Sequence, residues 1–314
     1  NYGVVGTGTF NNAGELRKAF NTTVVSSPFT PVFNNLATGV VNVNSGTLDL
    51  SGAGTDAAGS VYNVAASTTL QFGGSRSIAG NIAGAGNVTF YNPGRTYTLT
   101  GDYNIAGTTA TSWGCCTASS LTFAGTVTNV GTTLSSGGSG AIDFSGITAG
   151  QASAFANLTS ISNAGNLTFK DGTAFTALST LTNTGGTLNF GASPVTLTTL
   201  NMTGGTLTGS GAITIPNGGT LNWSGGTIDS TVAGTLLTTA AGSTTTLAVG
   251  GLGANRTWDN GGTVTQAALG CCSSFTLNGT INNQAGGVFI LNNSLNNYGV
   301  VGTGTFNNAG ELRK

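Results

Sequence analysis

Residues 163–190 read NAGNLTFKDGTAFTALSTLTNTGGTLNF and contain the pattern that decides the fold. A triplet of apolar, polar and large apolar residues occurs there twice, at Leu167-Thr168-Phe169 and at Leu188-Asn189-Phe190. Such alternation with a period of two is the signature of a β-strand with one buried face. The residues between the triplets show no 3.6-residue apolar period. They leave room for two further short strands and their turns, but not for a helix.

The same triplet recurs along most of the chain. Its spacing of about 20 residues predicts one coil of a parallel β-solenoid per interval, with a rise of about 4.8 Å per coil. We therefore expect an all-β, right-handed parallel β-helix of about 14 or 15 coils, its hand following the general rule for parallel crossovers. Clear triplets begin at Leu48, Leu70, Val88, Leu121, Ile142, Leu167 and Leu188, and looser ones at Leu207, Leu221, Leu247 and Phe275.

Large aromatic residues fall at the inward end of many triplets. If equivalent positions of successive coils stack, these rings form one aromatic file in the core. The tryptophans Trp113, Trp223 and Trp258 are candidates for a sugar-stacking surface, but we expect them to pack in the core or at corners. The expected file consists of Phe72, Phe90, Phe123, Phe144, Phe169 and Phe190.

The sequence repeats itself over a much longer distance. Residues 1–18 read NYGVVGTGTFNNAGELRK, and residues 297–314 are identical to them, at an offset of 296. The simplest interpretation is that residues 1–296 are one tandem repeat unit forming a continuous β-solenoid, and that residues 297–314 start the next identical unit. Solenoid ends are normally capped, because bare strand edges aggregate. Neither copy of the shared segment resembles a cap, so we expect a filament of many units, joined covalently or stacked head to tail.

The composition argues against several classes of function. Only 5 % of the residues are charged, the net charge is −1, and there is no His. No nucleic-acid partner and no membrane insertion are expected. Without His the usual general base and the commonest metal ligand are missing, and the Asp residues are scattered. We expect no enzyme, no metal site and no cofactor.

The abundant threonine raises the possibility of ice binding. A Thr-rich solenoid needs two files of Thr on one flat face for that purpose. Steps of the Gly-Thr-Leu type suggest at most one file, which would contain Thr47, Thr187, Thr206 and Thr227. The sequence therefore argues against ice binding.

Part of the sequence resembles a known group of proteins. Residues 9–18 (TFNNAGELRK), 33–35 (FNN) and 41–50 (VNVNSGTLDL) resemble repeats of giant bacterial surface proteins, whose passenger regions belong with the filamentous-haemagglutinin and autotransporter β-helices. The resemblance implies secretion and a surface, matrix or adhesive role, and it carries over no binding residues. We expect a structural repeat of an extracellular filament, sheath or matrix fibre that associates end to end and laterally with copies of itself. The alternative is an adhesin-type passenger that binds glycans.

The four cysteines occur as two adjacent pairs, Cys115-Cys116 and Cys271-Cys272. Each pair follows a Gly and precedes a similar strand, and the pairs are 156 residues apart. In one straight rod that separation is about seven coils, or about 35 Å, whereas a disulfide needs Cα atoms within about 7 Å. Three options remain: free thiols, a disulfide within each pair, or disulfide cross-links between rods. Cross-links best explain why pairs recur at nearly half-unit intervals, and an oxidising exterior would maintain them.

Overall fold

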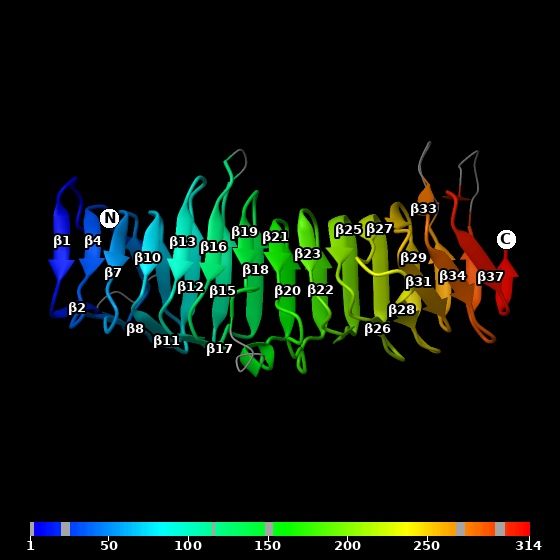
Figure 1. Cartoon of the computed structure of the whole chain (residues 1–314), viewed down its shortest axis with the longest axis horizontal. Helices are drawn as coiled ribbons and strands as arrows, with labels where there is room; N and C mark the ends of the chain where they lie inside the picture. The colour runs from blue at the N-terminus through cyan, green and yellow to red at the C-terminus, as the bar shows by residue number, and fades with distance from the viewer. Residues whose placement is uncertain (1–2, 20–25, 115–116, 148–152, 268–273, 293–298) are drawn as a thin grey trace. The chain divides into compact units, whose positions relative to one another are not determined.

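The computed structural model is all-β, with parallel strands about 22 residues apart stacked as a β-solenoid of about 13 turns (Figure 1). It describes residues 3–19, 26–114, 117–147, 153–267, 274–292 and 299–314. The predicted fold class is confirmed. The turns are slightly longer than expected, so there are fewer of them. Right-handed winding stays a prediction.

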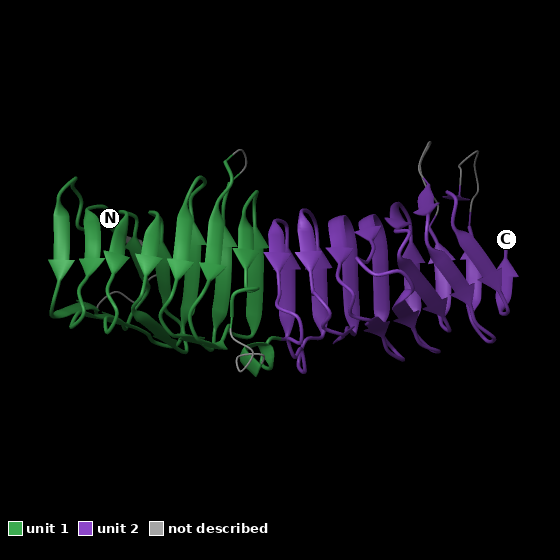
Figure 2. Ribbon diagram, viewed as in Figure 1, with its two compact units in different colours: residues 1–158 green, residues 159–314 purple. Residues whose placement is uncertain are grey.

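The chain divides into two compact units, residues 1–158 and residues 159–314 (Figure 2). This division differs from the repeat boundary expected after residue 296. That boundary was inferred from sequence identity and not from compactness, so the tandem unit of residues 1–296 also stays a prediction.

Unit 1 is built from three ladders of parallel strands, and successive strands of the chain visit the three ladders in turn. Each ladder is named here by its first strand. The β1 ladder contains β1 (Thr9–Asn12), β4 (Val32–Asn35), β7 (Gly54–Asp56), β10 (Arg76–Ile78), β13 (Thr96–Leu99), β16 (Ser120–Phe123) and β19 (Ala141–Asp143). The β2 ladder contains β2 (Glu15–Lys18), β5 (Val40–Val43), β8 (Val61–Val64), β11 (Asn81–Gly84), β14 (Tyr103–Ile105) and β17 (Val127–Asn129). The β3 ladder contains β3 (Ser26–Phe29), β6 (Thr47–Leu50), β9 (Thr69–Phe72), β12 (Asn87–Tyr91), β15 (Thr108–Ser112) and β18 (Thr133–Gly137).

Unit 2 also has three ladders. The β20 ladder contains β20 (Ser160–Asn163), β22 (Thr180–Asn183), the first parts of β25 (Thr199–Thr208) and β27 (Thr220–Ile228), β29 (Thr244–Leu247), β32 (Thr263–Gln266), β35 (Val288–Leu291) and β38 (Glu311–Arg313). The β21 ladder contains β21 (Asn166–Thr168), β23 (Thr187–Asn189), the last parts of β25 and β27, β30 (Gly250–Leu252), β33 (Phe275–Leu277) and β36 (Val300–Val301). The β24 ladder contains β24 (Val195–Thr196), β26 (Ile213–Ile215), β28 (Thr235–Thr239), β31 (Arg256–Asn260), β34 (Thr280–Asn283) and β37 (Thr305–Asn308).

Strands β25 and β27 pass from one ladder to the next through glycine corners. Gly205 and Gly226 have φ angles of 67° and 72°, a left-handed conformation that disfavours side chains. A Cβ added at Gly205 would also collide with the backbone of Gly185 in the preceding turn. Glycine is thus required there both by conformation and by the close stacking of the turns.

The predicted aromatic core exists, but not as one file. All six phenylalanines are at most 2 % exposed, and they stack in three pairs with centroid distances of 5.3, 4.4 and 5.4 Å. The pair Phe72–Phe90 belongs to the β3 ladder, whereas Phe123 lies in the β1 ladder. The Phe72–Phe90 stack ends there because the residue in register with Phe90 on the next turn is Thr111. The single-file prediction is therefore wrong, whereas the predicted burial of the tryptophans is confirmed, since all three are at most 3 % exposed.

Candidate assembly edges

The segment shared by residues 1–18 and 297–314 forms two strands in each of its copies. In unit 1, β1 pairs with β4 and β2 pairs with β5, so that copy pairs with the turn that follows it in the chain. In unit 2, β37 pairs with β34 and β38 pairs with β35, so that copy pairs with the turn that precedes it. One sequence is therefore seen pairing through each of its two strand edges.

The inward side chains at both edges form ladders of amides, all of them buried except Asn308. In unit 1 the side-chain amide of Asn12 donates to Asn35 at 2.8 Å. In unit 2 Asn260 donates to Asn283 at 2.8 Å, and Asn283 donates to Asn308 at 2.7 Å. Asn308 is the repeat equivalent of Asn12. Every bond in this series runs from the earlier turn to the later one, so the donor direction is the same at both edges.

A second amide series runs along the outer surface in the opposite direction. Asn34 donates to Asn11 at 2.9 Å in unit 1, and Asn307 donates to Asn282 at 2.9 Å in unit 2. Asn282 in turn donates to Asp259 at 2.7 Å. Here each donor lies on the later turn. Asn307 is equivalent to Asn11, so the outer series also has one direction at both edges.

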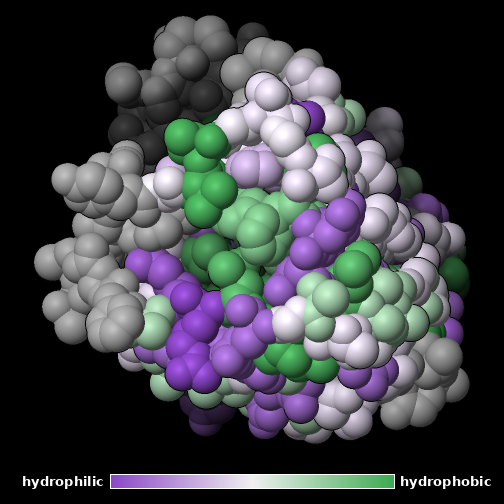
Figure 3. Space-filling model, turned by 90° about the vertical axis from the view of Figure 1, so that its left-hand side faces the viewer, coloured by the Kyte–Doolittle hydropathy of each residue, from purple (hydrophilic) through white to green (hydrophobic). Residues whose placement is uncertain are grey.

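The edge of unit 1 exposes apolar side chains. Among the described residues of unit 1, every well-exposed large apolar side chain lies between residues 4 and 36, including Val5 at 72 % and Phe10 at 40 %. Figure 3 shows this end with hydrophobic atoms near its centre and hydrophilic residues beside them. In unit 2, Leu312 of the shared segment is 49 % exposed. A solenoid core left uncovered at a strand edge is suited to receive another turn.

Buried charged side chains lie away from the edges and form hydrogen bonds and an ion pair inside the core. In unit 1, Arg76 pairs with Asp56 at 2.8 Å, and both side chains are fully buried. Burial raises the pKa of the Asp56 carboxyl, and the charge of Arg76 opposes that shift. The Tyr62 hydroxyl donates to the same carboxylate, and its own pKa is raised well above its ordinary value, chiefly by burial.

In unit 2 a single buried arginine links three turns. Arg256 is 1 % exposed and donates to the carbonyl oxygens of Gly209, Gly211, Asp229 and Leu236. Desolvation lowers the pKa of Arg256 to about 10, so the guanidinium remains charged at neutral pH. The sequence does not indicate this role, because an isolated Arg among Ala, Asn and Thr gives no local signal of burial.

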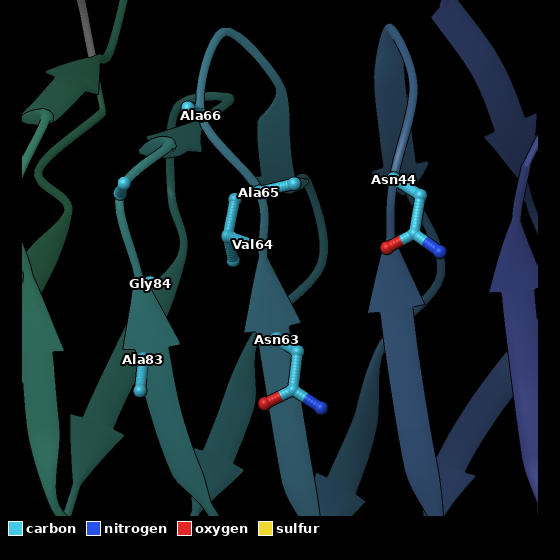
Figure 4. Close-up of a pocket in the computed structure, with 8 residues that line it drawn as sticks. Asn44, Asn63, Val64, Ala65, Ala66, Ala83 and Gly84 are labelled. Carbon is cyan, nitrogen blue, oxygen red and sulfur yellow. The ribbon is translucent and has the colours of Figure 1, made fainter.

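Two surface hollows within the described part of the chain are lined without ionisable side chains. One hollow of about 310 Å³ in unit 1 is lined by Asn44, Asn63 and small residues of the neighbouring turns, among them Ala65 and Gly84 (Figure 4). A hollow of about 380 Å³ in unit 2 is lined by glycines of residues 226–253, with Thr227, Val249 and Asn278. Neither lining offers an acid, a base or a charged ligand group.

The described residues contain neither a metal-binding cluster nor a membrane-spanning helix. Among them, no three His, Cys, Asp or Glu side chains lie close enough together to hold a metal ion. No helix in that part of the chain is long and apolar enough to span a bilayer. The predicted cross-link residues Cys115, Cys116, Cys271 and Cys272 lie outside the described residues. Their three options stay open.

Comparisons with protein-family models, with curated proteins and with solved structures found no match to this chain.

Proposed function

We propose that this chain is a repeat module of a long structural β-solenoid fibre outside the cell, and that the shared segment is the joint between modules. The observation that carries this proposal is the matching direction of the amide series at the two edges. In a tandem array, residues 305–313 of one module occupy the place of residues 9–17 of the next. The inner series then runs without reversal from Asn260 through Asn283 and the joint to Asn35 of the next module.

The apolar residues of the joint support the same arrangement. Phe10 stacks on Phe33 with a centroid distance of 5.9 Å on one edge, and its equivalent Phe306 packs against Phe289 at 5.1 Å on the other. Joining the edges covers this ring from both sides. Burial of apolar area contributes about 25 cal/mol per Å², so covering one large ring stabilises the joint by roughly 2 kcal/mol.

The extracellular part of the proposal rests on the resemblance of residues 9–50 to bacterial surface repeats. For the adhesin alternative, the candidate sugar-stacking residues were Trp113, Trp223 and Trp258, and all three are buried. The fibre is therefore the better supported role. Binding of an isolated module to a glycan array at micromolar affinity or better would reverse this ranking.

The size of the native polypeptide tests the covalent form of the fibre. Native material is reduced, denatured and separated by electrophoresis, with the recombinant 30.8 kDa chain as the size marker. A tandem fibre protein migrates at many times that mass. A band or ladder near one module mass contradicts the covalent array.

Lateral association through the cysteines is a separate part of the proposal. Peptides from unreduced native material are mapped by mass spectrometry. Cross-linked fibres yield Cys115/Cys116 peptides joined to Cys271/Cys272 peptides or to their own equivalents. Disulfides confined to one peptide, or thiols that alkylate without reductant, would eliminate the cross-links and leave the fibre proposal standing.

A further inference from the structure

The outward positions of the β20 ladder form two parallel files of small polar side chains. The sequence suggested at most one Thr file, and that expectation is wrong. Thr187, Thr206 and Thr227 do align, in the β21 ladder, whereas Thr47 lies in unit 1. The β20 ladder adds a first file of Ser160, Thr180, Thr199, Thr220, Thr244 and Thr263, and a second file of Ser162, Thr182, Asn201, Asn222, Thr246 and Thr265.

The two files make a regular two-dimensional array. Neighbouring turns are about 4.8 Å apart, and outward positions on one strand are about 6.6 Å apart. The register is continuous from β20 to β32 at all of these positions. The five turns from Thr180 to Thr263 therefore span about 19 Å.

The array is held rigidly. Threonine is β-branched and stiff at χ1, which restricts the directions of its hydroxyl and methyl groups. In the second file, Asn222 donates to Asn201 at 2.8 Å and Asn201 donates to Thr182 at 3.2 Å. The inward residues between the files, such as Leu200 and Leu221, are completely buried and support the sheet from below.

The outer hydroxyls are available to a ligand. Within the described part of the chain, the hydroxyls of Thr180, Thr199, Thr220, Thr244 and Thr263 form no hydrogen bond with protein. These five side chains are half-buried or exposed. A row of fixed hydroxyls at constant spacing thus faces the solvent.

The side chains of this face exclude several classes of ligand. The twelve positions carry no charge, so phosphate or acidic partners gain no ion pair there. They carry no aromatic or large aliphatic side chain, so the face lacks the anchors of a protein interface and the platforms on which sugars stack. What remains is a rigid lattice of hydroxyl, amide and methyl groups.

We infer that this face binds ice, the ligand being the ordered water of a crystal surface. Each hydroxyl or amide bonds one lattice water, and the methyl groups fill the spaces between these waters. One such contact is weak, because it replaces a hydrogen bond that the same group makes with bulk water. Many contacts on a preorganised array act together, and the combined affinity far exceeds that of any one of them.

Partition of the intact chain into slowly growing ice tests the inference. The variant is Thr199→Tyr/Thr220→Tyr, which places two bulky rings on the array without changing an inward residue. The matched control is Thr214→Tyr/Thr238→Tyr on the β24 ladder, where the two threonines are in register and half-buried as well. Circular dichroism confirms that all three proteins keep their strands.

The wild-type chain and the control are expected to concentrate in the ice, and the array variant to lose on the order of tenfold or more of that enrichment. Rejection of the wild-type chain by ice, to the extent seen for an ordinary soluble protein, overturns the inference. Equal losses in the array variant and the control also overturn it. Because one module suffices for the measurement, its failure leaves the fibre proposal unaffected.

Discussion

Replacing Arg76 by Met tests how the buried ion pair supports unit 1. Arg76 contacts Asp56 at 2.8 Å and the carbonyl oxygen of Phe33 at 2.9 Å, and it lies 5.6 Å from the ring centroids of Phe33 and Phe72. Methionine keeps most of the volume but leaves the Asp56 carboxylate buried without a countercharge. Breaking a buried pair in this way costs about 3–5 kcal/mol.

The effect should stay local, because the turns of a solenoid contact mainly their neighbours and Arg76 reaches no further than Phe33, two turns away. Hydrogen exchange followed by mass spectrometry measures the opening of each segment in the intact chain. A loss of about 3 kcal/mol corresponds to roughly 150-fold faster exchange in β7 and β10 at neutral pH. Arg95→Met, at an exposed position of the same unit, should change exchange little. Faster exchange spread equally over unit 2 would refute the local account.

The pH dependence of the stability of Arg76→Met shows whether the unpaired Asp56 carboxylate causes the loss. Burial already raises the pKa of Asp56, and without Arg76 it rises further. Folded Asp56 then holds its proton at pH values where the unfolded chain, with a pKa of about 3.9, has released it. The contribution of Asp56 to the free energy of unfolding is therefore highest below about pH 4 and falls as pH rises through the folded-state pKa. Asp56→Asn/Arg76→Met should recover most of the loss at neutral pH, and a deficit independent of pH would show that desolvated charge is not its source.

Further substitutions test the packing and the joint. Trp223→Ala removes a fully buried ring whose centroid lies 4.9 Å from that of Phe275. The free energy of unfolding should fall by about 3–5 kcal/mol, measured as faster hydrogen exchange in β27 and β33. Unchanged exchange would contradict the placement of Trp223 in the core. Asn283→Leu removes one side-chain hydrogen bond from each of its neighbours in the amide series, Asn260 and Asn308. It should lower the stability of β34 by about 1–3 kcal/mol, which thermal or exchange measurements detect. Gly138→Ala places a Cβ against the Trp113 carbonyl at a φ of 80°, whereas the Cβ of Gly172→Ala, at a φ of 76°, enters open space. Gly138→Ala should therefore destabilise its turn clearly more than Gly172→Ala. Equal effects of the two substitutions would show that the close approach to Trp113 is unimportant.

The sequence sufficed for the fold class because the information is local. The alternation in Leu167-Thr168-Phe169 fixes a strand and its inward face, whatever lies beside it. The assignment of each strand to a ladder depends on pairing between residues that are far apart in the sequence. The step from Val88 to Leu121 is 33 residues, and only the pairing shows that the pattern moves there from the β3 ladder to the β1 ladder.

The threonine array and the buried arginine could not be predicted for the same reason, since both depend on which strands pair. Thr180, Thr199, Thr220 and Thr244 are separated by unequal steps of 19, 21 and 24 residues, so no fixed period reveals that they align. Arg256 binds carbonyl groups up to 47 residues away, which depends on the stacking of whole turns. The matching directions of the amide series likewise required side-chain geometry, although the repeated segment that contains them was plain from the sequence.

The central claim is that the shared segment joins one module to the next. It is tested with a chain in which residues 1–314 are followed by a second copy of residues 19–314. The amides of Thr305 in β37 and of Ala309, which directly follows it, already bond to the preceding turn. The alternate amides of Phe306 and Asn308 therefore point to the open edge. Joined modules should slow exchange of the Phe306 and Asn308 amides at least tenfold, with little change at Thr305 and Ala309. Equal exchange of the Phe306 and Asn308 amides in the one-module and two-module chains would contradict the claim.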